Sequence, residues 1–500
     1  MRVAVRILLL SIFCLWSGAV LAATERVALV LGLGAYQTIE QLDNTRNDAR
    51  AIAESLEGIG FDVTLSLDAT GEELRQLLDD FSFRSEVADL ALIYFAGHGV
   101  EAQGENFLIP IDAKITSNRD IQRQSISLKQ VLASVERARK MRIVILDSCR
   151  DNPLGDSIDL AQSLSNGAQS EAGGTRGGGG LAAAKPDRGT LVAFAAKDGQ
   201  VALDGTGENS PYARALIEKM VEPGLEISLM FRQVRDKVLQ ETNNLQEPHT
   251  YGSLTGVPFY LAGAAEGQKD ISGGVGQAAW ASIRPDQEEQ LLALADLGDT
   301  RSMLGLAYMR LNPNEGRFDP VQAVAFLEKA SAAGSPEAQF ELAKIYERGT
   351  GVPVDEPRAL ELYRAAADQD FADAINDLGF LYYQGGLGLP SDPEKALDLF
   401  ERAADLRHPQ ALFNFAALID DGLIASKGPA DAADYLYAAL RSGSRDVLDL
   451  LSARPKMFSP QTRRALQSTL KKFDFYDGAI DGEFGPNTIK SIRLAYGLKE

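Results

Sequence analysis

The chain is 500 residues long, which corresponds to about three or four domains at the usual domain size. Its 70 acidic and 50 basic residues give a net charge of −20, which argues against nucleic acid or an anionic membrane surface as a partner. With three histidines and two cysteines in the whole sequence, the usual ligand sets of a zinc site cannot be assembled.

The first residues have the pattern of a secretory signal peptide. Arg2 and Arg6 are followed by an apolar run over 7–16 and by a small-residue cleavage site, Val20-Leu21-Ala22. We therefore expect residues 1–22 to be removed and the protein to be exported, with the periplasm as the simplest location. After this segment no apolar stretch approaches the roughly 20 residues that span a bilayer, so the mature chain is expected to be soluble, with no transmembrane segment.

Residues 26–262 alternate short apolar runs with helical stripes, which indicates an α/β domain. The strand candidates are VALVLGLG, FDVTLSL, ADLALIYF, FLIP, RIVILDS and TLVAFAA, and the helical stripes lie at 47–60, 127–140, 210–222 and 228–242. Apolar strands separated by helices indicate a mainly parallel sheet with helices on both faces. The Ser-, Gln- and Gly-rich segment 154–190 interrupts the pattern and is expected to be a flexible loop with a role in processing or gating.

Two of these strands lead to residues that can carry out nucleophilic chemistry. RIVILDS leads to Cys149, the only cysteine outside the signal segment, and ALIYFAG leads to His98, about fifty residues upstream. Carboxyl ends of parallel strands meet at one edge of a sheet, where catalytic groups collect. In this interpretation Cys149 is the nucleophile, His98 is the base, and the backbone N–H groups of Gly99 and Cys149 hold the oxyanion. Gly97 and Gly99 are expected to let the backbone turn sharply beside the imidazole. The alternatives are a buried, inert cysteine and a structural histidine.

The second half of the chain is expected to be helical. A Gly-, Ala- and Ser-rich linker at 263–287 precedes an internal repeat over 288–445, in which SMLGLAYMR, AQFELAKIYERG, AINDLGFLYYQG and ALFNFAALIDDG recur every 36 to 37 residues. A second amphipathic helix follows each segment, as in AVAFLEKASAAG, ALELYRAAADQD and ALDLFERAADLR, and two helices per repeat indicate a solenoid. The string LAKIYERGTGVPVDEPRALELYRAAA resembles the Sel-type branch of the tetratricopeptide superfamily. That resemblance implies that the repeats bind a protein partner.

Residues 452–500 are predicted to form a further small unit, with two helices on either side of the turn DGAIDGEFGPNT. This unit resembles the small three-helix peptidoglycan-binding module, which implies peptidoglycan as a further partner. The matching positions are Asp481, Gly482, Phe484, Gly485, Pro486 and Thr488. The alternative is a module that caps the end of the solenoid.

The first block, 26–262, resembles a caspase-fold peptidase of the bacterial metacaspase-like kind, the orthocaspases. The resemblance rests on RVALVLGLGAY, the NDA of 47–49, YFAGHG, LDSCRD, TLVAFAAKDGQVALDG, NSPYARAL and LQEPHTYGSLTGVPFYL. It implies the caspase α/β sandwich and carries the catalytic dyad over to His98 and Cys149. Metacaspases often need calcium, but here only Asp112 and Asp120 lie near the histidine strand, with no dense acidic cluster. Calcium activation is therefore left open, and no other cofactor is predicted.

Acidic residues in the first block predict the substrate. A pocket lined with carboxylates favours Arg or Lys before the scissile bond. Asp147 lies two residues before the cysteine, and Asp48 in NDA matches the metacaspase position that helps to bind a basic side chain. Asp198 is the predicted third wall, with Asp204 competing for this place, and the alternative for Asp147 is a loop cap. A peptidase of this specificity could process itself in the loop, and Arg176 is the preferred site.

These features predict an exported cysteine endopeptidase that cleaves proteins after Arg or Lys, with repeats for protein interaction and a small module for cell-wall attachment. One rival is an inactive caspase-fold scaffold that acts through its repeats, and another is a cell-wall amidase or peptidase. The intact His98 and Cys149 favour an enzyme over a scaffold. The acidic residues favour a protein substrate over a wall peptide.

Overall fold

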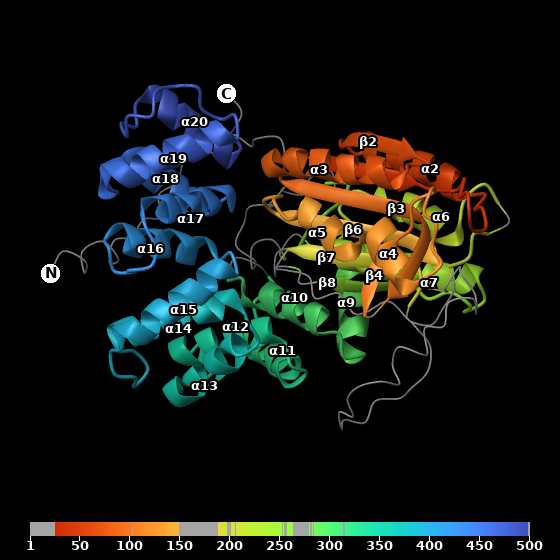
Figure 1. The fold of residues 1–500 in the computed structure, drawn as a ribbon. Helices are drawn as coiled ribbons and strands as arrows, with labels where there is room; N and C mark the ends of the chain where they lie inside the picture. The colour runs from red at the N-terminus through yellow and green to blue at the C-terminus, as the bar shows by residue number, and fades with distance from the viewer. Residues whose placement is uncertain are drawn as a thin grey trace, which may run out of the picture. The chain divides into compact units, whose positions relative to one another are not determined.

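The computed structural model describes residues 26–102, 104–149, 189–197, 202–205, 207–252, 254, 258–263, 280, 283, 285–313 and 316–498. The chain divides into two compact units, Thr24–Asp270 and Ile271–Glu500 (Figure 1). The predicted signal peptide and almost all of the predicted loop 154–190 lie outside the described residues. Within the described ranges, no helix is long and apolar enough to cross a membrane.

The first unit is built on a central sheet. Its main strands are β1 (Arg26–Gly32), β2 (Asp62–Leu67), β3 (Leu90–Ala102), β6 (Met141–Cys149), β7 (Thr190–Phe194) and β8 (His249–Gly252). They lie in the order β2-β1-β3-β6-β7-β8 and are parallel, except that β8 pairs antiparallel with β7. Two short strands, β4 (Glu105–Leu108) and β5 (Ile126–Ser127), extend the far end of β3 in antiparallel pairing. The predicted mainly parallel sheet is confirmed.

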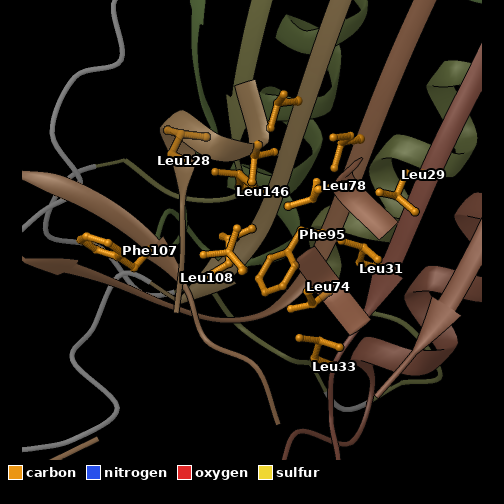
Figure 2. Packing of buried hydrophobic residues seen from close by; sticks show 14 of the residues in the cluster. Leu29, Leu31, Leu33, Leu74, Leu78, Phe95, Phe107, Leu108, Leu128 and Leu146 are labelled. Atoms are coloured by element: carbon orange, nitrogen blue, oxygen red, sulfur yellow. The ribbon is translucent and has the colours of Figure 1, made fainter. Parts of the chain in front are cut away.

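One face of the sheet is covered by α3 (Gly71–Val87) and α5 (Leu128–Val135), with the short α4 (Asn118–Gln124) nearby. Because side chains alternate between the two faces of a strand, every second strand residue reaches this layer. The buried cluster on this face includes Leu29, Leu31, Phe95 and Leu146 of the strands and Leu74 and Leu78 of α3 (Figure 2). Burial of each such side chain contributes about 1.5–3 kcal/mol, so this layer fixes the positions of β1, β3 and β6.

The opposite face of the sheet is covered by α2 (Thr45–Gly58), α6 (Pro211–Met220) and α7 (Ile227–Glu241). The apolar stripe of α2, which includes Ala49 and Ile52, is buried against the strands. The same alternation directs Tyr94 of β3 and Asp147 of β6 to this face, where both are buried. Polar groups are therefore buried between the sheet and the helices α2 and α6.

The second unit is helical. After α9 (Pro285–Asp296), four helix pairs follow one another: α10 (Thr300–Leu311) with α11 (Pro320–Ala332), α12 (Pro336–Arg348) with α13 (Glu356–Ala367), α14 (Ala372–Gln384) with α15 (Pro393–Asp405), and α16 (Pro409–Asp420) with α17 (Pro429–Arg441). Small residues let paired helices approach closely. A Cβ on Gly379 of α14 would lie 2.8 Å from the ring of Phe400 in α15. The predicted solenoid is confirmed.

The end of the second unit packs against the last repeat. It contains α18 (Arg445–Ala453), the 3₁₀ turn η4 (Pro455–Met457), α19 (Pro460–Lys472) and α20 (Pro486–Tyr496). Phe473 stacks on Tyr437 of α17 with ring centroids 4.9 Å apart, and the Thr462 hydroxyl donates to Asp420 Oδ1 at 2.7 Å. The buried Gln467 accepts the Gly482 N–H at 2.7 Å and so holds the turn DGAIDGEFGPNT. This packing is the one expected of a cap on the solenoid.

Candidate active site

The two predicted catalytic residues are neighbours at the edge of the parallel sheet. The parallel register of β3 and β6 makes His98 and Cys149 the last pair of partners. Adjacent strands lie about 4.8 Å apart, so this register brings the two backbones side by side. The imidazole of His98 is buried. The structure describes the backbone of Cys149 but not its side chain.

A backbone carbonyl sets the orientation of His98. The Nε2 atom lies 2.8 Å from the carbonyl oxygen of Glu40, which can only accept, so Nε2 carries the proton and donates it. The Nδ1 atom is buried and has no hydrogen-bond partner among the described residues. Burial lowers the pKa of His98, so the imidazole is neutral near pH 7 and Nδ1 is a free base.

Tyr36 fixes the backbone of His98 as well as its ring. The Tyr36 hydroxyl accepts the His98 N–H at 2.8 Å and donates to the Ile109 carbonyl at 3.2 Å. The two rings are in contact, with centroids 4.6 Å apart. Gly97 is required for this packing, because a Cβ there would lie 2.7 Å from the Tyr36 hydroxyl oxygen.

The expected sharp turn at the glycines is wrong. β3 runs through Gly97, His98 and Gly99 without a break and ends at Ala102. The parallel pairing with β6 stops at His98, and beyond it β3 pairs with β4, where Gly99 lies opposite Leu108. Gly97 therefore allows close packing against Tyr36 and does not reverse the chain. The predicted oxyanion role of Gly99 and Cys149 stays a prediction.

The loop between β1 and α2, residues 33–44, supplies the carbonyl that holds His98. Asp68 shapes this loop, because its Oδ1 accepts the N–H groups of Gly34 and Ala35, both at 2.8 Å. Asp68 itself has a positive φ of 52°, and Gly34 has no room for a Cβ, which would lie 2.5 Å from the Leu42 carbonyl. The loop is thus held by contacts in which the imidazole takes no part.

A small acidic cavity lies beside the dyad. It has a volume of about 20 Å³ and is lined by Asp48, Asp147 and Asp204 together with Leu42, Thr45, Gly97, Ala202, Leu203 and Ser210. Gly97 immediately precedes His98 in β3, so the cavity adjoins His98. Three carboxyl groups from α2, β6 and the segment 202–205 therefore converge next to this histidine.

Neutral groups hold the carboxylates of this cavity. Asp48 Oδ1 accepts from Asn209 Nδ2 and from the Ser210 N–H, both at 2.9 Å. Asp147 Oδ2 accepts from the Ser210 hydroxyl at 2.9 Å and from the Tyr94 hydroxyl at 3.0 Å. Asp204 Oδ2 accepts the Asn44 N–H at 3.3 Å. Within the described part of the chain, no lysine or arginine forms an ion pair with any of the three carboxylates.

Burial without a cation makes these carboxylates difficult to ionise. Desolvation is the main cause that raises the pKa of Asp48 to about 6 and that of Asp147 to about 7. The charge of Asp48 raises the pKa of Asp147 further, while the hydrogen bonds from Ser210 and Tyr94 lower it. Burial also raises the pKa of Asp204. The described residues therefore place three carboxyl groups in the cavity without a Lys or Arg to compensate their negative charge.

The structure brings together two of the three residues predicted for the pocket walls. Asp48 and Asp147 both line the cavity, and Asp147 lies within β6 rather than capping a loop. Asp198 lies outside the described residues, whereas its competitor Asp204 lines the cavity. The proposed self-processing site, Arg176, also lies outside the described residues.

The two carboxylates considered for calcium have local roles. Asp112 accepts the Gly71 N–H at 2.8 Å, at the start of α3. Asp120 accepts from the Ser117 hydroxyl at 2.7 Å and from the Thr116 hydroxyl at 2.8 Å, and these hydrogen bonds lower its pKa. In the part of the chain that the structure describes, no three or more His, Cys, Asp or Glu residues are grouped to hold a metal ion.

Sequence reasoning did not single out several residues that build the site. Ser210 lies in the segment NSPYARAL and had a recognisable signal, a serine N-cap followed by proline at the first helical position. The roles of Tyr36 and Tyr94 depend on contacts between strands that only the register decides. The carbonyl of Glu40 has no side-chain signal at all.

A mainly parallel sheet flanked by helices, with His98 and Cys149 in register at its edge, agrees with the caspase-like fold predicted from the sequence. Residues 25–259 match the family model of the caspase domain. Residues 300–335, 336–371 and 372–408 each match the model of the Sel1 repeat. The chain thus contains a caspase domain followed by Sel1 repeats.

Similar proteins match parts of the chain. The human mucosa-associated lymphoid tissue lymphoma translocation protein 1 and its mouse homologue are each 28% identical over 144 residues, which is 28% of this chain and 17% of theirs. The chain therefore matches about one sixth of the length of these curated relatives.

Two solved structures also resemble parts of the chain. A structure of pro-sf-caspase-1 is 16% identical and has a TM-score of 0.36, covering 49% of this chain and 93% of that one. A crystal structure of a Sel1 repeat protein from Oxalobacter formigenes is 29% identical with a TM-score of 0.23, covering 23% of this chain and 88% of that one.

Proposed function

We propose that the caspase domain is a cysteine endopeptidase that cleaves protein chains after Arg or Lys. The observation that carries this proposal is the cavity beside His98, in which Asp48, Asp147 and Asp204 converge and pair with no Lys or Arg among the described residues. Ionised carboxylates that are buried without a cationic partner destabilise the folded protein, and an entering cationic side chain stabilises their ionised forms. At about 20 Å³ the cavity holds about one water molecule, so we expect its walls to move apart when an arginine enters.

In the proposed mechanism the free Nδ1 of His98 takes the proton of the Cys149 thiol. The sulfur then attacks the scissile carbonyl carbon, and backbone N–H groups of Gly99 and Cys149 stabilise the oxyanion. His98 returns the proton to the leaving amine, which leaves a thioester on Cys149. Attack of water on the thioester, with His98 again as base, releases the acid and restores the thiol. The Glu40 carbonyl stabilises the imidazolium in each step because it accepts a hydrogen bond from Nε2–H.

Hydrolysis of matched fluorogenic peptides tests the proposal. Peptides that differ only in Arg, Lys or Asp before the scissile bond are compared with the wild type, Cys149→Ala and Asp48→Asn, with and without calcium. Turnover of the Arg and Lys peptides that is lost in Cys149→Ala supports the peptidase, and its selective loss in Asp48→Asn supports the acidic pocket. Cleavage after Asp would contradict the specificity. Absence of turnover under every condition would favour the scaffold hypothesis.

Export and protein binding by the repeats are part of this proposal. The N-terminal pattern of charge, apolar run and small residues supports export to the periplasm. Cell fractionation of a tagged chain, with and without residues 1–22, measures this directly. Recovery of both forms from the cytoplasm alone would contradict it.

Attachment to peptidoglycan through residues 452–500 is a further proposal. It rests on the sequence of the turn, which Gln467 holds in place. Co-sedimentation of the full chain with purified cell-wall sacculi, beside variants with exposed turn residues such as Glu483→Ala, measures binding. If the chain stays in the supernatant, the packing of this module on α17 is left as its role.

A further inference from the structure

The N–H and the hydroxyl of Ser210 both donate to carboxylates of the acidic cavity. Its N–H donates to Asp48 Oδ1 at 2.9 Å, and its hydroxyl donates to Asp147 Oδ2 at 2.9 Å. The same hydroxyl oxygen accepts the Ala213 N–H at 3.0 Å and so caps α6. Only 3% of Ser210 is exposed. One residue therefore ties α2, β6 and the start of α6 together through two carboxylates.

The donated hydrogen bond is not needed for capping. A helix N-cap only has to accept an N–H, and glycine is nearly as good an N-cap as serine. The hydroxyl proton of Ser210, by contrast, is directed at Asp147. This proton opposes the repulsion between Asp147 and Asp48, because a hydrogen bond to a carboxylate favours its charged form.

We propose that Ser210 is a positioning residue for substrate recognition, which holds Asp48 and Asp147 as a pair that faces one cationic side chain. The inference rests on the proposed cleavage after Arg or Lys. Two carboxylates from separate elements form a receptor for a guanidinium only while their distance and direction are fixed. Ser210 bonds to both, and the hydrogen bonds of its N–H and hydroxyl go to Asp48, Asp147 and Ala213 and not to His98, so it acts through the carboxylates.

Charged and titratable groups from several elements surround Asp48 and Asp147. Asp48 lies on α2, Asp147 on β6, and Asp204 in the segment 202–205, while Tyr94 of β3 and Tyr212 of α6 are buried beside Asp147. His98 of β3 and Asp43 of the loop 33–44 also act on Asp204, with opposite effects on its pKa. Loss of the Ser210 hydroxyl removes a donor from Asp147 and leaves the repulsion from Asp48, so the pKa of Asp147 rises.

Ser210→Gly tests the proposal in the full-length protein, with Ser127→Gly as the matched control. Ser127 also caps a helix of the same unit, α5, with its side chain accepting from Gln130, on the opposite face of the sheet. The readouts are KM and kcat for an Arg peptide, the acid limb of kcat/KM against pH, and thermal unfolding. Ser210→Thr keeps both the donor and the cap and serves as the rescue variant.

We expect Ser210→Gly to raise KM about tenfold, because a hydrogen bond to a charged group is lost. We expect kcat to change less than about twofold, since His98 and Cys149 are untouched. The acid limb of kcat/KM moves to higher pH, because the carboxylates must lose their protons before a cation binds. Ser127→Gly leaves KM, kcat and the acid limb unchanged, and Ser210→Thr restores KM and the acid limb.

Failure of the inference differs from failure of the proposed function. If the wild type does not cleave the Arg peptide, the proposed specificity fails and the inference falls with it. If the wild type cleaves it but Ser210→Gly keeps its KM and its acid limb, Ser210 does not position the carboxylates. If Ser210→Gly only lowers the unfolding temperature and kcat, Ser210 is a helix cap alone and the inference is overturned.

Discussion

Replacement of Asp147 by asparagine changes the charge of the acidic cavity with little change in shape. Both donors to this side chain, the Ser210 and Tyr94 hydroxyls, converge on Oδ2. An asparagine with its carbonyl oxygen in that place keeps both hydrogen bonds. It cannot ionise, so the variant removes the cost of a buried carboxylate and also removes a contact to a cationic substrate.

The sign of the stability change follows from the pKa of Asp147. In the unfolded chain this carboxyl ionises near pH 3.8, whereas in the folded protein it keeps its proton until about pH 7. The folded state therefore binds more protons between these values, and the stability of the wild type falls as the pH rises through this window. At 1.36 kcal/mol per pKa unit, the cost is about 2 kcal/mol at pH 5 and about 4 kcal/mol at pH 8. Asp147→Asn removes this cost.

Thermal unfolding of Asp147→Asn at pH 5 and pH 8 measures the effect, in a Cys149→Ala background that prevents self-cleavage. A gain of about 4 kcal/mol raises the unfolding temperature of a unit of this size by on the order of 10 °C at pH 8, and by about half as much at pH 5. Asp89→Asn is the matched control, because Asp89 is equally buried but pairs with Arg139 and Lys140. It is expected to destabilise the unit. A gain for Asp147→Asn that is absent at pH 8, or independent of pH, refutes the reasoning.

Three further predictions concern the surroundings of His98 and the segment 154–190. Tyr36→Phe leaves the His98 N–H without its acceptor and is expected to lower kcat about tenfold, measured as turnover of the Arg peptide with thermal unfolding as the control for folding. Gly97→Ala places a Cβ 2.8 Å from the Phe95 ring, so urea unfolding is expected to show a loss of about 1–3 kcal/mol; unchanged stability would contradict the packing. Arg176→Ala is expected to abolish cleavage within the segment 154–190 during incubation of the purified protein. If intact-mass spectrometry finds the same fragments as in the wild type, this site is ruled out.

Much of the scaffold could be predicted because its signals are local. The apolar runs that became β1, β3 and β6 are buried on both faces, so they stand out from the helical stripes around them. α3 was not among the predicted helices, since its buried residues Leu74 and Leu78 lie in a strongly charged sequence. β8 is only four residues long and lies at the edge, and its pairing with β7 is decided by the fold.

The candidate site was predictable in part. His98 and Cys149 could be paired because the ends of parallel strands share an edge. The choice between Asp198 and Asp204 could not be made from the sequence, because no local pattern tells which carboxylate reaches a cavity; the structure places Asp204 there, and Asp198 lies outside the described residues. The role of Ser210 depends on the distance between α2 and β6, which no local pattern encodes.

The carbonyl oxygen that orients His98 belongs to the backbone of Glu40, and every amino acid possesses that atom. The side chain at position 40 can therefore vary while the backbone carbonyl continues to orient His98. Substitutions of Asp68 and Gly34 are expected to be harmful instead, because these two residues determine the path of the loop 33–44. A mutational scan would record position 40 as tolerant, and the substitutions that disturb the orientation of His98 would appear at Asp68 and Gly34, whose hydrogen bonds and close contacts do not involve the imidazole.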